Sequence, residues 1–311
     1  MKLSIVTTMY CSAPYLQEFH ARASTAARQL TDDYEIVFVN DGSPDNALEV
    51  AVALYEGDEK VRIIDLSCNF GHHKAIMTGL SQVHGEKVFL IDCDLEEAPE
   101  LLPQFCQMMQ QTGADVVYGV QATRKGDWFE RVSGDLCYGL LNRLTKCSLP
   151  RNVITARLMS RRYVESLVRH RDREIFLLGL WAITGYQQVP MTVVKGSKGS
   201  TTYNFSRKLG MLVNAITSFS NKPLIVVFYL GTLISSAAVI AAMVLVIRRL
   251  AYGVYMSGWP SLIVSIWLLG GLTIFCLGII GIYLAKVFTE TKDRPYTVIR
   301  HLYEREGGSQ K

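Results

Sequence analysis

The sequence is poor in several features that mark common classes of protein. Its seven cysteines are scattered and form no C-x-x-C pair or zinc-finger spacing, which argues against a disulfide framework or a structural zinc site. Neither G-x-x-x-x-G-K-[ST] nor G-x-G-x-x-G occurs, so a P-loop and a dinucleotide-binding fingerprint are unsupported. Basic runs interleaved with aromatic residues are missing, and the net charge is a modest +4. We therefore expect no nucleic-acid partner.

Charged side chains are absent from two long stretches, residues 223–247 and 250–285, in a chain whose mean hydropathy is +0.18. Each stretch exceeds the roughly 20 apolar residues that cross a bilayer as a helix. We predict two transmembrane helices, near Leu224–Ile247 and Ser261–Ala285, with aromatic residues in the connection between them. The alternative, a long uncharged helix in a soluble core, fits such composition less well.

The distribution of basic residues predicts how these helices are oriented. Only Arg248 and Arg249 lie between the two helices, whereas six basic residues flank the pair: Arg207, Lys208, Lys222, Lys286, Lys292 and Arg294. The positive-inside rule then puts both termini in the cytoplasm. The first residues, MKLSIVTTMY, lack the features of a signal peptide and read as a short strand, which agrees with a cytoplasmic N-terminal part.

The segment before the helices has an amphipathic pattern. Apolar residues recur there at helical spacing, namely Leu209, Leu212, Val213, Ile216 and Phe219. Such a helix suits the membrane surface, and packing onto a globular domain is an equally good interpretation. We divide the chain into a globular domain (1–204), an amphipathic juxtamembrane helix (205–222), two transmembrane helices (223–288) and a cytoplasmic tail (289–311).

The globular domain alternates strand and helix patterns. The predicted strands are Leu3–Thr8, Glu35–Asn40, Val61–Leu66, Val88–Ile91 and Asp115–Gly119, and helical stretches such as Tyr15–Leu30, Asn46–Glu56 and Leu101–Gln111 separate them. This alternation predicts an α/β domain with a mainly parallel, Rossmann-like sheet. Polar residues follow the strands at Tyr10–Pro14, Asp41–Ser43 and Asn69–Gly71, and we expect them to share one site at the carboxyl ends of the strands.

The stretch FLIDCDLEEAPE runs from an apolar strand directly into a cluster of acids. Asp92, Asp94 and Glu96 alternate on the loop that follows this strand. Their carboxylates are the type of ligand that Mg²⁺ or Mn²⁺ prefers, so the loop is a candidate metal site. A solvated loop that caps the next helix is the alternative, because D-x-D is a short pattern.

Several motifs together resemble the polyprenyl-phosphate glycosyltransferases of glycosyltransferase family 2. They occur in order as VFVNDGSPDN, LSCNFGHHKAIMTGL, IDCDLEEAPE, NVITARLMSRRYVESL and NAITSFSNKPL, with ETKDRP after the predicted membrane helices. That family includes bactoprenol glucosyltransferases and dolichyl-phosphate mannose synthases. The resemblance covers nearly the whole chain. It implies a GT-A-type domain that moves a sugar from a nucleotide diphosphate, with a UDP-sugar favoured, onto a polyprenyl phosphate such as undecaprenyl phosphate, with inversion and a divalent metal.

The resemblance also implies roles for particular residues of this chain. It maps the binding of the nucleotide base to Asp41, and the metal on the diphosphate to Asp92, Asp94 and Glu96. Residues Thr8, Tyr10, Asn69 and Gly71 join Asp41 and Asp92 as the predicted donor-binding set. Arg131 matches the arginine that contacts the acceptor phosphate, with Arg124 nearby, and these two are grouped with Asp94 as catalytic residues. Lys195 and Lys198 are further candidates for the acceptor phosphate.

The chain departs from the family pattern at four places. Glu96 stands where relatives usually have Gln, and Cys11-Ser12 replaces a common Asn-Glu pair. His72-His73 follows N-F-G where many relatives have Lys, and we favour a surface position for these two residues over phosphate binding. Thr155 occupies the position of an Asp that is often proposed as a base.

The expected location is the bacterial inner membrane, with two membrane passes and the catalytic domain in the cytoplasm; a homo-oligomer is left open. A non-catalytic subunit that binds or assembles sugar-lipids is the main alternative function, since the changes at Ser12 and Thr155 touch the site. A processive polysaccharide synthase is disfavoured because no Q-x-x-R-W motif occurs. A soluble nucleotidyltransferase is disfavoured by the two uncharged stretches.

Overall fold

A computed structural model describes residues 2–121, 152–193, 216–217, 220–252 and 258–305 of the chain. These residues form two compact units. Residues 2–121, 152–193 and 294–305 make up the first unit, which contains the sheet, and the described residues from 216 to 293 make up the second, which contains two long helices. The first unit therefore includes chain from both sides of the helical unit.

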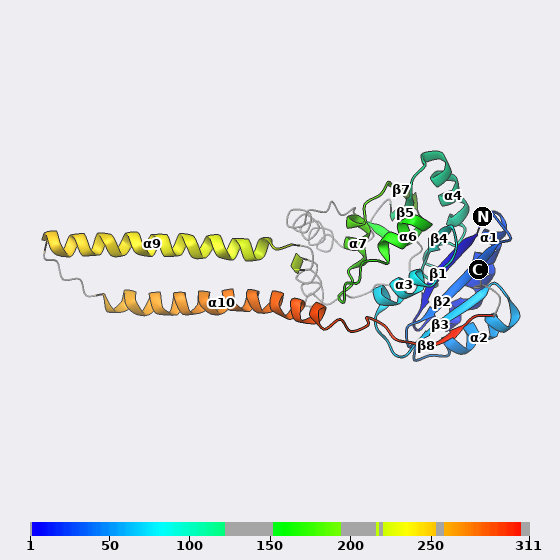
Figure 1. Ribbon diagram of the computed structural model, residues 1–311, viewed down its shortest axis with the longest axis horizontal. Helices are drawn as coiled ribbons and strands as arrows, with labels where there is room; N and C mark the ends of the chain where they lie inside the picture. The colour runs from blue at the N-terminus through cyan, green and yellow to red at the C-terminus, as the bar shows by residue number, and fades with distance from the viewer. Residues whose placement is uncertain (1, 122–151, 194–215, 218–219, 253–257, 306–311) are drawn as a thin grey trace. The chain divides into compact units, whose positions relative to one another are not determined.

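Strands and helices alternate through the first unit (Figure 1). Its first half contains β1 (Leu3–Met9), α1 (Leu16–Arg28), β2 (Tyr34–Asn40), α2 (Ala47–Gly57), β3 (Val61–Leu66), α3 (His72–Ser81) and β4 (Lys87–Leu90). Then come α4 (Leu101–Thr112), β5 (Val116–Gln121), β6 (Val153–Ser160), α6 (Arg161–Leu167), α7 (Leu177–Ile183), β7 (Gln188–Val193) and, after the helical unit, β8 (Ile299–Tyr303). The five predicted strands are confirmed within one or two residues at their ends.

Eight strands within the described residues form one sheet in the order β7-β5-β6-β4-β1-β2-β3-β8. Its centre is parallel, because β1 pairs in parallel with β2 and β4, and β2 pairs in parallel with β3. β6 runs antiparallel between β4 and β5, and β8 runs antiparallel along β3. The fold is the predicted α/β class with a GT-A-like mixed sheet.

Helices cover both faces of this sheet. A continuous apolar core joins α1, α2 and α4 to one face, where Phe19 on α1 stacks edge to face on Phe38 of β2. On the other face α3 lies close to β1 and β2, since a Cβ at Gly79 would come within 2.8 Å of Val6 and Val39. Burial on both sides explains why these central strands read as unbroken apolar runs rather than as alternating patterns.

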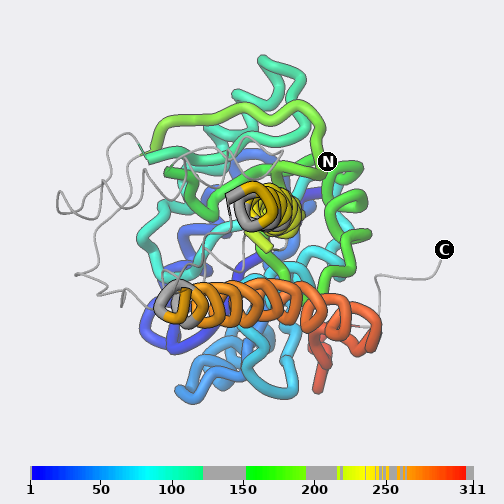
Figure 2. Tube along the Cα trace, turned by 90° about the vertical axis from the view of Figure 1, so that its left-hand side faces the viewer, coloured from blue at the N-terminus to red at the C-terminus, as the bar shows by residue number. Residues whose placement is uncertain are grey.

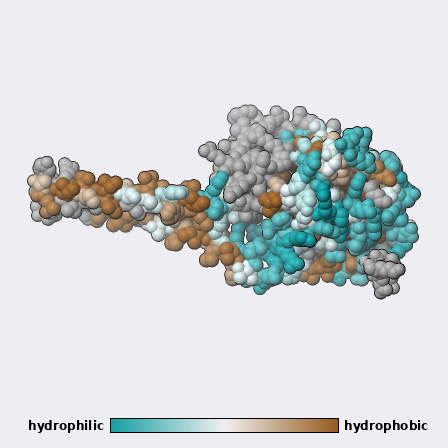
Figure 3. All heavy atoms as spheres, turned by 45° about the horizontal axis from the view of Figure 1, so that its top comes forward, coloured by the Kyte–Doolittle hydropathy of each residue, from teal (hydrophilic) through white to brown (hydrophobic). Residues whose placement is uncertain are grey.

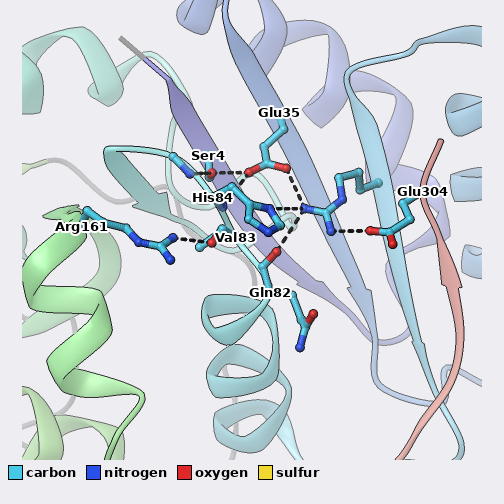
Figure 4. Close-up of polar contacts among 9 residues, drawn as sticks. Ser4, Glu35, Gln82, Val83, His84, Arg161 and Glu304 are labelled. Atoms are coloured by element: carbon cyan, nitrogen blue, oxygen red, sulfur yellow. Dashed lines mark hydrogen bonds and ion pairs between the residues drawn. The ribbon is translucent and has the colours of Figure 1, made fainter. Parts of the chain in front are cut away.

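The amino ends of the strands are joined by a buried charge network (Figure 4). Arg62 on β3 pairs with Glu35 of β2 at 2.8 Å and with Glu304, just after β8, at 2.8 Å. Ser4 on β1 and the backbone amide of His84 also donate to Glu35. Burial acts to raise the pKa of Glu35, but these hydrogen bonds outweigh it and hold the pKa below its usual value.

The second unit consists mainly of α9 (Lys222–Tyr252) and α10 (Trp259–Thr291). Figure 1 draws both as long helices, and Figure 2 views α9 nearly along its axis. Their described side chains are largely apolar and exposed, and Figure 3 colours them mostly as hydrophobic. Segments Lys222–Ala241 and Ser265–Thr291 are long and apolar enough to cross a membrane. Of the predicted amphipathic helix at 205–222, most residues lie outside the described part of the chain.

Candidate functional site

The carboxyl ends of four parallel strands bring the predicted polar loops to one edge of the sheet. Because β4, β1, β2 and β3 are neighbours and point the same way, the loops that follow them leave the sheet at the same end. The loops contain Tyr10, residues 41–43, residues 69–71 and the acidic residues 92–94 in turn. The predicted site is thus assembled from segments far apart in the sequence.

Successive side chains of the acidic loop point alternately to the core and to the surface. Cys93 is buried, its thiol donates to the carbonyl of Thr8 at 3.1 Å, and burial raises its pKa to about 11. The flanking side chains of Asp92 and Asp94 are partly exposed, as expected for neighbours that point the other way. Asp94 accepts a hydrogen bond from the amide of Glu96 at 3.0 Å. The loop therefore presents two carboxylates at the strand end.

His72 lies between the first strand and the acidic loop. Its Nδ1 atom is 3.0 Å from the hydroxyl of Thr8, and its Nε2 atom is 3.6 Å from a carboxylate oxygen of Asp92. The side chain is exposed, as predicted, but it contacts two residues of the predicted donor site. The sequence analysis did not include His72 among the site residues, and the only signal was its place directly after N-F-G.

Asp41 connects the loop after β2 to the loop after β3, both of which are predicted to bind the donor. Its carboxylate accepts hydrogen bonds from the amides of Phe70 at 2.7 Å and Gly71 at 3.0 Å, and burial raises its pKa despite these bonds. Gly71 has a φ of +100°, a conformation that favours glycine, and it immediately precedes α3. Asp41 therefore fixes the backbone of the loop after β3, whatever else it binds.

The loop after β1 is hydrogen-bonded to the segment that follows β2. The amide of Cys11 donates to the hydroxyl of Ser43 at 2.7 Å, and the amide of Ala13 donates to Asp45 at 3.0 Å. Hydrogen bonds from the Ser43 hydroxyl and from three backbone amides outweigh the effect of burial and lower the pKa of Asp45. The unusual Cys11-Ser12 pair thus lies in an ordered loop whose backbone is held by the segment after β2.

Two buried charged residues were missed by the sequence analysis. Glu97 follows the acidic loop, is 1% exposed, and accepts hydrogen bonds from the amides of Thr155 at 3.1 Å and Ala156 at 2.7 Å. Arg157 is also buried, with its guanidinium over the ring of Trp181, and burial lowers its pKa to about 9. Glu97 binds β6 to the acidic loop and places Thr155 beside it.

Some predicted residues are not brought together or are not described. Arg124, Arg131, Lys195 and Lys198 lie outside the described residues. Within the described ranges, no group of three or more His, Cys, Asp or Glu side chains is placed to hold a metal ion. The metal roles of Asp92, Asp94 and Glu96 therefore stay predictions.

Comparison with known proteins identifies the family. The glycosyl transferase family 2 model matches residues 4–168. A protein of Mycobacterium tuberculosis (strain CDC 1551 / Oshkosh), whose name places it among the glycosyltransferases, is 54% identical, covering 97% of this chain and 89% of that protein. The bactoprenol glucosyl transferase of Shigella phage SfV is 30% identical, covering 97% of this chain and 99% of its own length.

Solved structures also align with the chain. The crystal structure of mannosyl-3-phosphoglycerate synthase from Rubrobacter xylanophilus has 18% identity and a TM-score of 0.49, and the alignment covers 70% of this chain and 73% of that one. The family model spans more than half of the chain, and the two relatives cover nearly all of it. The chain belongs to glycosyltransferase family 2, and it is a glycosyltransferase with a GT-A-like fold.

Proposed function

We propose that this protein transfers a sugar from a nucleotide diphosphate, with a UDP-sugar favoured, to a polyprenyl phosphate at the cytoplasmic face of a bacterial inner membrane. The observation that carries the proposal is the gathering of the loops after β1 to β4 at one edge of the sheet, with Asp41 and Asp92 among them. The relative from Shigella phage SfV, which is named for glucosyl transfer to bactoprenol, supports the acceptor class.

The acidic loop suits a divalent cation, Mg²⁺ or Mn²⁺, held jointly by the protein and the donor. In the described residues neither Asp92 nor Asp94 forms an ion pair with Lys or Arg, and the side chain of Asp92 is 26% exposed. Mg²⁺ commonly takes one or two carboxylates and completes its shell with phosphate oxygens and water. When bound, the cation stabilises negative charge on the departing diphosphate. Two protein carboxylates fit that arrangement without a third ligand.

The acceptor explains why the family Asp at position 155 is dispensable in this proposal. A phosphate monoester is ionised near neutral pH and already presents an anionic oxygen to the anomeric carbon, so attack needs no enzymic base. Displacement from the side opposite the diphosphate inverts the anomeric centre. The predicted role of Arg131, with Arg124, Lys195 and Lys198, is to orient this anionic acceptor by charge-assisted hydrogen bonds.

The two long helices suit a membrane hairpin. Residues 294–305 belong to the same compact unit as residues 2–121 and 152–193, so the chain leaves this unit before the two long helices and returns to it after them. An even number of crossings, which α9 and α10 would provide, satisfies that connectivity. The hairpin would keep the protein where the long isoprenoid acceptor resides and make their encounter local.

The placement is tested by labelling cysteines from outside the inner membrane. In a background without the native cysteines, Ser257→Cys should react with a membrane-impermeant reagent, whereas Gly307→Cys should react only after permeabilisation. Labelling of Gly307→Cys in intact cells would reverse the topology. Equal protection of both would argue against a membrane-crossing hairpin.

The activity is tested with the purified full-length protein, undecaprenyl phosphate, Mg²⁺ or Mn²⁺, and a panel of UDP- and GDP-sugars. Mass detection of the lipid should reveal one hexosyl-phosphoryl product. Nucleotide binding without transfer from any donor would favour the non-catalytic sugar-lipid binding subunit instead. Transfer to a soluble acceptor in preference to the lipid would exclude the proposed acceptor class.

A further inference from the structure

The strand that follows the helical unit lies against the edge of the sheet next to the donor loops. β8 runs antiparallel to β3, and the register places Ile299 opposite Leu66 and His301 opposite Asp65. Arg300 is therefore an extra residue in the pairing, at a bulge. Bulges commonly re-aim a side chain, and here the guanidinium of Arg300 reaches Asp65 and the carbonyl of Ser67.

One line of contacts leads from Arg300 to the turn after β2. Its guanidinium donates to one carboxylate oxygen of Asp65 at 3.4 Å, and Asp65 is 2% exposed. The other oxygen of Asp65 accepts from the amide side chain of Asn40 at 2.8 Å. The carbonyl oxygen of that Asn40 side chain accepts from the backbone amide of Ser43 at 3.1 Å. Asn40 and Ser43 bracket the turn that contains Asp41.

A second line leads from β8 to the loop after β3. Ser67 donates its amide to the carbonyl of Val298 at 2.9 Å, and its own carbonyl accepts from Arg300 at 2.5 Å. The loop that starts at Ser67 continues to the two amides that Asp41 binds. A Cβ at Gly42 would lie 2.5 Å from the backbone of residues 68 and 69, so the two loops are in direct contact.

Both lines converge on the turn at residues 41–43, which the proposed function assigns to the nucleotide. We propose that Arg300 is a positioning residue for the donor site: through Asp65, Asn40 and Ser67 it holds the nucleotide-binding turn and the adjoining loop in place. The inference rests on the proposed function, since it requires that the turn binds a nucleotide. Loss of the guanidinium removes the cation from the buried Asp65 carboxylate and the hydrogen bond that Arg300 donates to the Ser67 carbonyl.

The same C-terminal segment offers a matched control. Arg305 donates to the carbonyls of Tyr55 at 2.8 Å and Glu56 at 3.2 Å, and its guanidinium lies 5.4 Å from the centre of the Tyr55 ring. These contacts fasten the segment to the end of α2 rather than to the donor turn. Arg300 and Arg305 therefore carry the same charge and lie five positions apart in the sequence, but only Arg300 reaches the donor loops.

The experiment compares Arg300→Met, Arg300→Lys and Arg305→Met in the full-length protein in detergent or nanodiscs. UDP affinity is measured by calorimetry with Mg²⁺ or Mn²⁺ present, and donor KM and kcat are measured with undecaprenyl phosphate. We expect Arg300→Met to raise the UDP Kd and the donor KM by about tenfold, with kcat and acceptor KM within about twofold of wild type. Arg305→Met should leave all four values within about twofold, and Arg300→Lys should fall between.

The results of this experiment distinguish failure of the Arg300 positioning role from failure of the proposed glycosyl transfer. Unchanged UDP affinity in Arg300→Met, or equal losses in both methionine variants, would overturn the positioning role while wild-type transfer upholds the function. Wild-type protein that binds no nucleotide would overturn both. If Arg300→Met does not fold, Arg300→Lys decides: a donor KM equal to that of wild type contradicts the inference.

Discussion

The two ends of the central sheet both carry acidic side chains, but their charges are balanced in different ways. At the amino ends, Glu35 has Arg62 within 2.8 Å, and its side chain is 9% exposed. At the carboxyl ends, the partner of Asp92 among the described residues is His72, at 3.6 Å, and Asp92 is more exposed. A histidine neutralises a carboxylate only when it is protonated, whereas an arginine is charged at all ordinary pH values.

This difference separates an acid that holds the fold from acids that are available to a ligand. The Glu35 network is complete in itself, because an arginine, a hydroxyl and an amide satisfy its oxygens. The carboxylates of Asp92 and Asp94 lie at the edge where parallel sheets bind ligands, and no arginine or lysine among the described residues forms an ion pair with them. Substitution at the amino end should therefore affect stability, and substitution at the carboxyl end should affect catalysis.

The largest expected effect is the loss of activity in Asp94→Asn. The change removes a carboxylate charge that we propose acts on the metal and the donor diphosphate, and turnover should fall by roughly 100-fold or more. Melting temperature should stay close to wild type, since the asparagine oxygen still accepts the hydrogen bond from the Glu96 amide. Transfer rate to undecaprenyl phosphate at saturating donor is the measurement.

Two further measurements sharpen this result. Asp32→Asn makes the same chemical change at an exposed loop residue and should have no effect on turnover. Chelation by EDTA should abolish wild-type transfer, and added Mg²⁺ or Mn²⁺ should restore it. Full activity in EDTA would refute the metal role and leave Asp94 without the function that we propose.

The next effect is on stability, at the opposite end of the sheet. Glu35→Gln removes a charge that is hydrogen-bonded to Arg62 and Ser4, so the free energy of unfolding should fall by about 2 kcal/mol. The matched control is Glu100→Gln, which breaks an exposed pair with Arg22 and should cost less than about 1 kcal/mol. Urea denaturation monitored by circular dichroism provides both values, and turnover of folded Glu35→Gln should match wild type.

The pH dependence of this difference follows from the lowered pKa of Glu35. The folded state favours the ionised form, so the stabilisation is complete above the ordinary pKa of 4.5. It is lost as the pH falls below 4.5 and through the lower pKa of the folded state. The gap between wild type and Glu35→Gln should therefore narrow under acid conditions. A gap that is constant from neutral to acid pH would show that Glu35 ionisation does not stabilise the fold.

The sequence predicted the centre of the fold because local patterns were sufficient there. Strands β1 to β4 are buried on both faces and appear as apolar runs that polar loops interrupt, so their ends and the residues after them were visible. The charge-free stretches likewise predicted α9 and α10. The gathering of Asp41 and Asp92 at one edge then followed from the parallel strand order.

Features that depend on the pairing of strands far apart in the sequence could not be predicted from local patterns. Neither β8 nor its bulge at Arg300 has a distinctive sequence pattern, since the strand is short and half polar and pairs with β3 over 230 positions away. The sequence did not distinguish Glu97 from the other acidic residues beside it. Its hydrogen bond to the amide of Thr155 forms because β6 pairs antiparallel with β4. The contacts of His72 with Thr8 and Asp92 also became visible only in three dimensions.

The smallest expected effect lies within the carboxyl end itself, at Thr155. Glu97 binds the backbone amides of residues 155 and 156 rather than the threonine side chain, so Thr155→Ala keeps both hydrogen bonds. Because an ionised phosphate acceptor needs no base, transfer should fall by less than about tenfold, or roughly 1.4 kcal/mol. Arg131→Ala should cost considerably more, if Arg131 orients the acceptor.

Two companion variants decide whether the backbone or the side chain matters at this position. Glu97→Gln loses the charge that accepts both amides and should reduce transfer more than Thr155→Ala, because the strand beside the acidic loop is then less firmly held. Thr155→Asp adds a negative charge next to the acceptor and should not raise the rate. Transfer to undecaprenyl phosphate at saturating donor is compared for all three variants. A large gain in Thr155→Asp would mean that a base is needed after all, and that the natural chain is a weak catalyst whose main role is to bind the sugar-lipid.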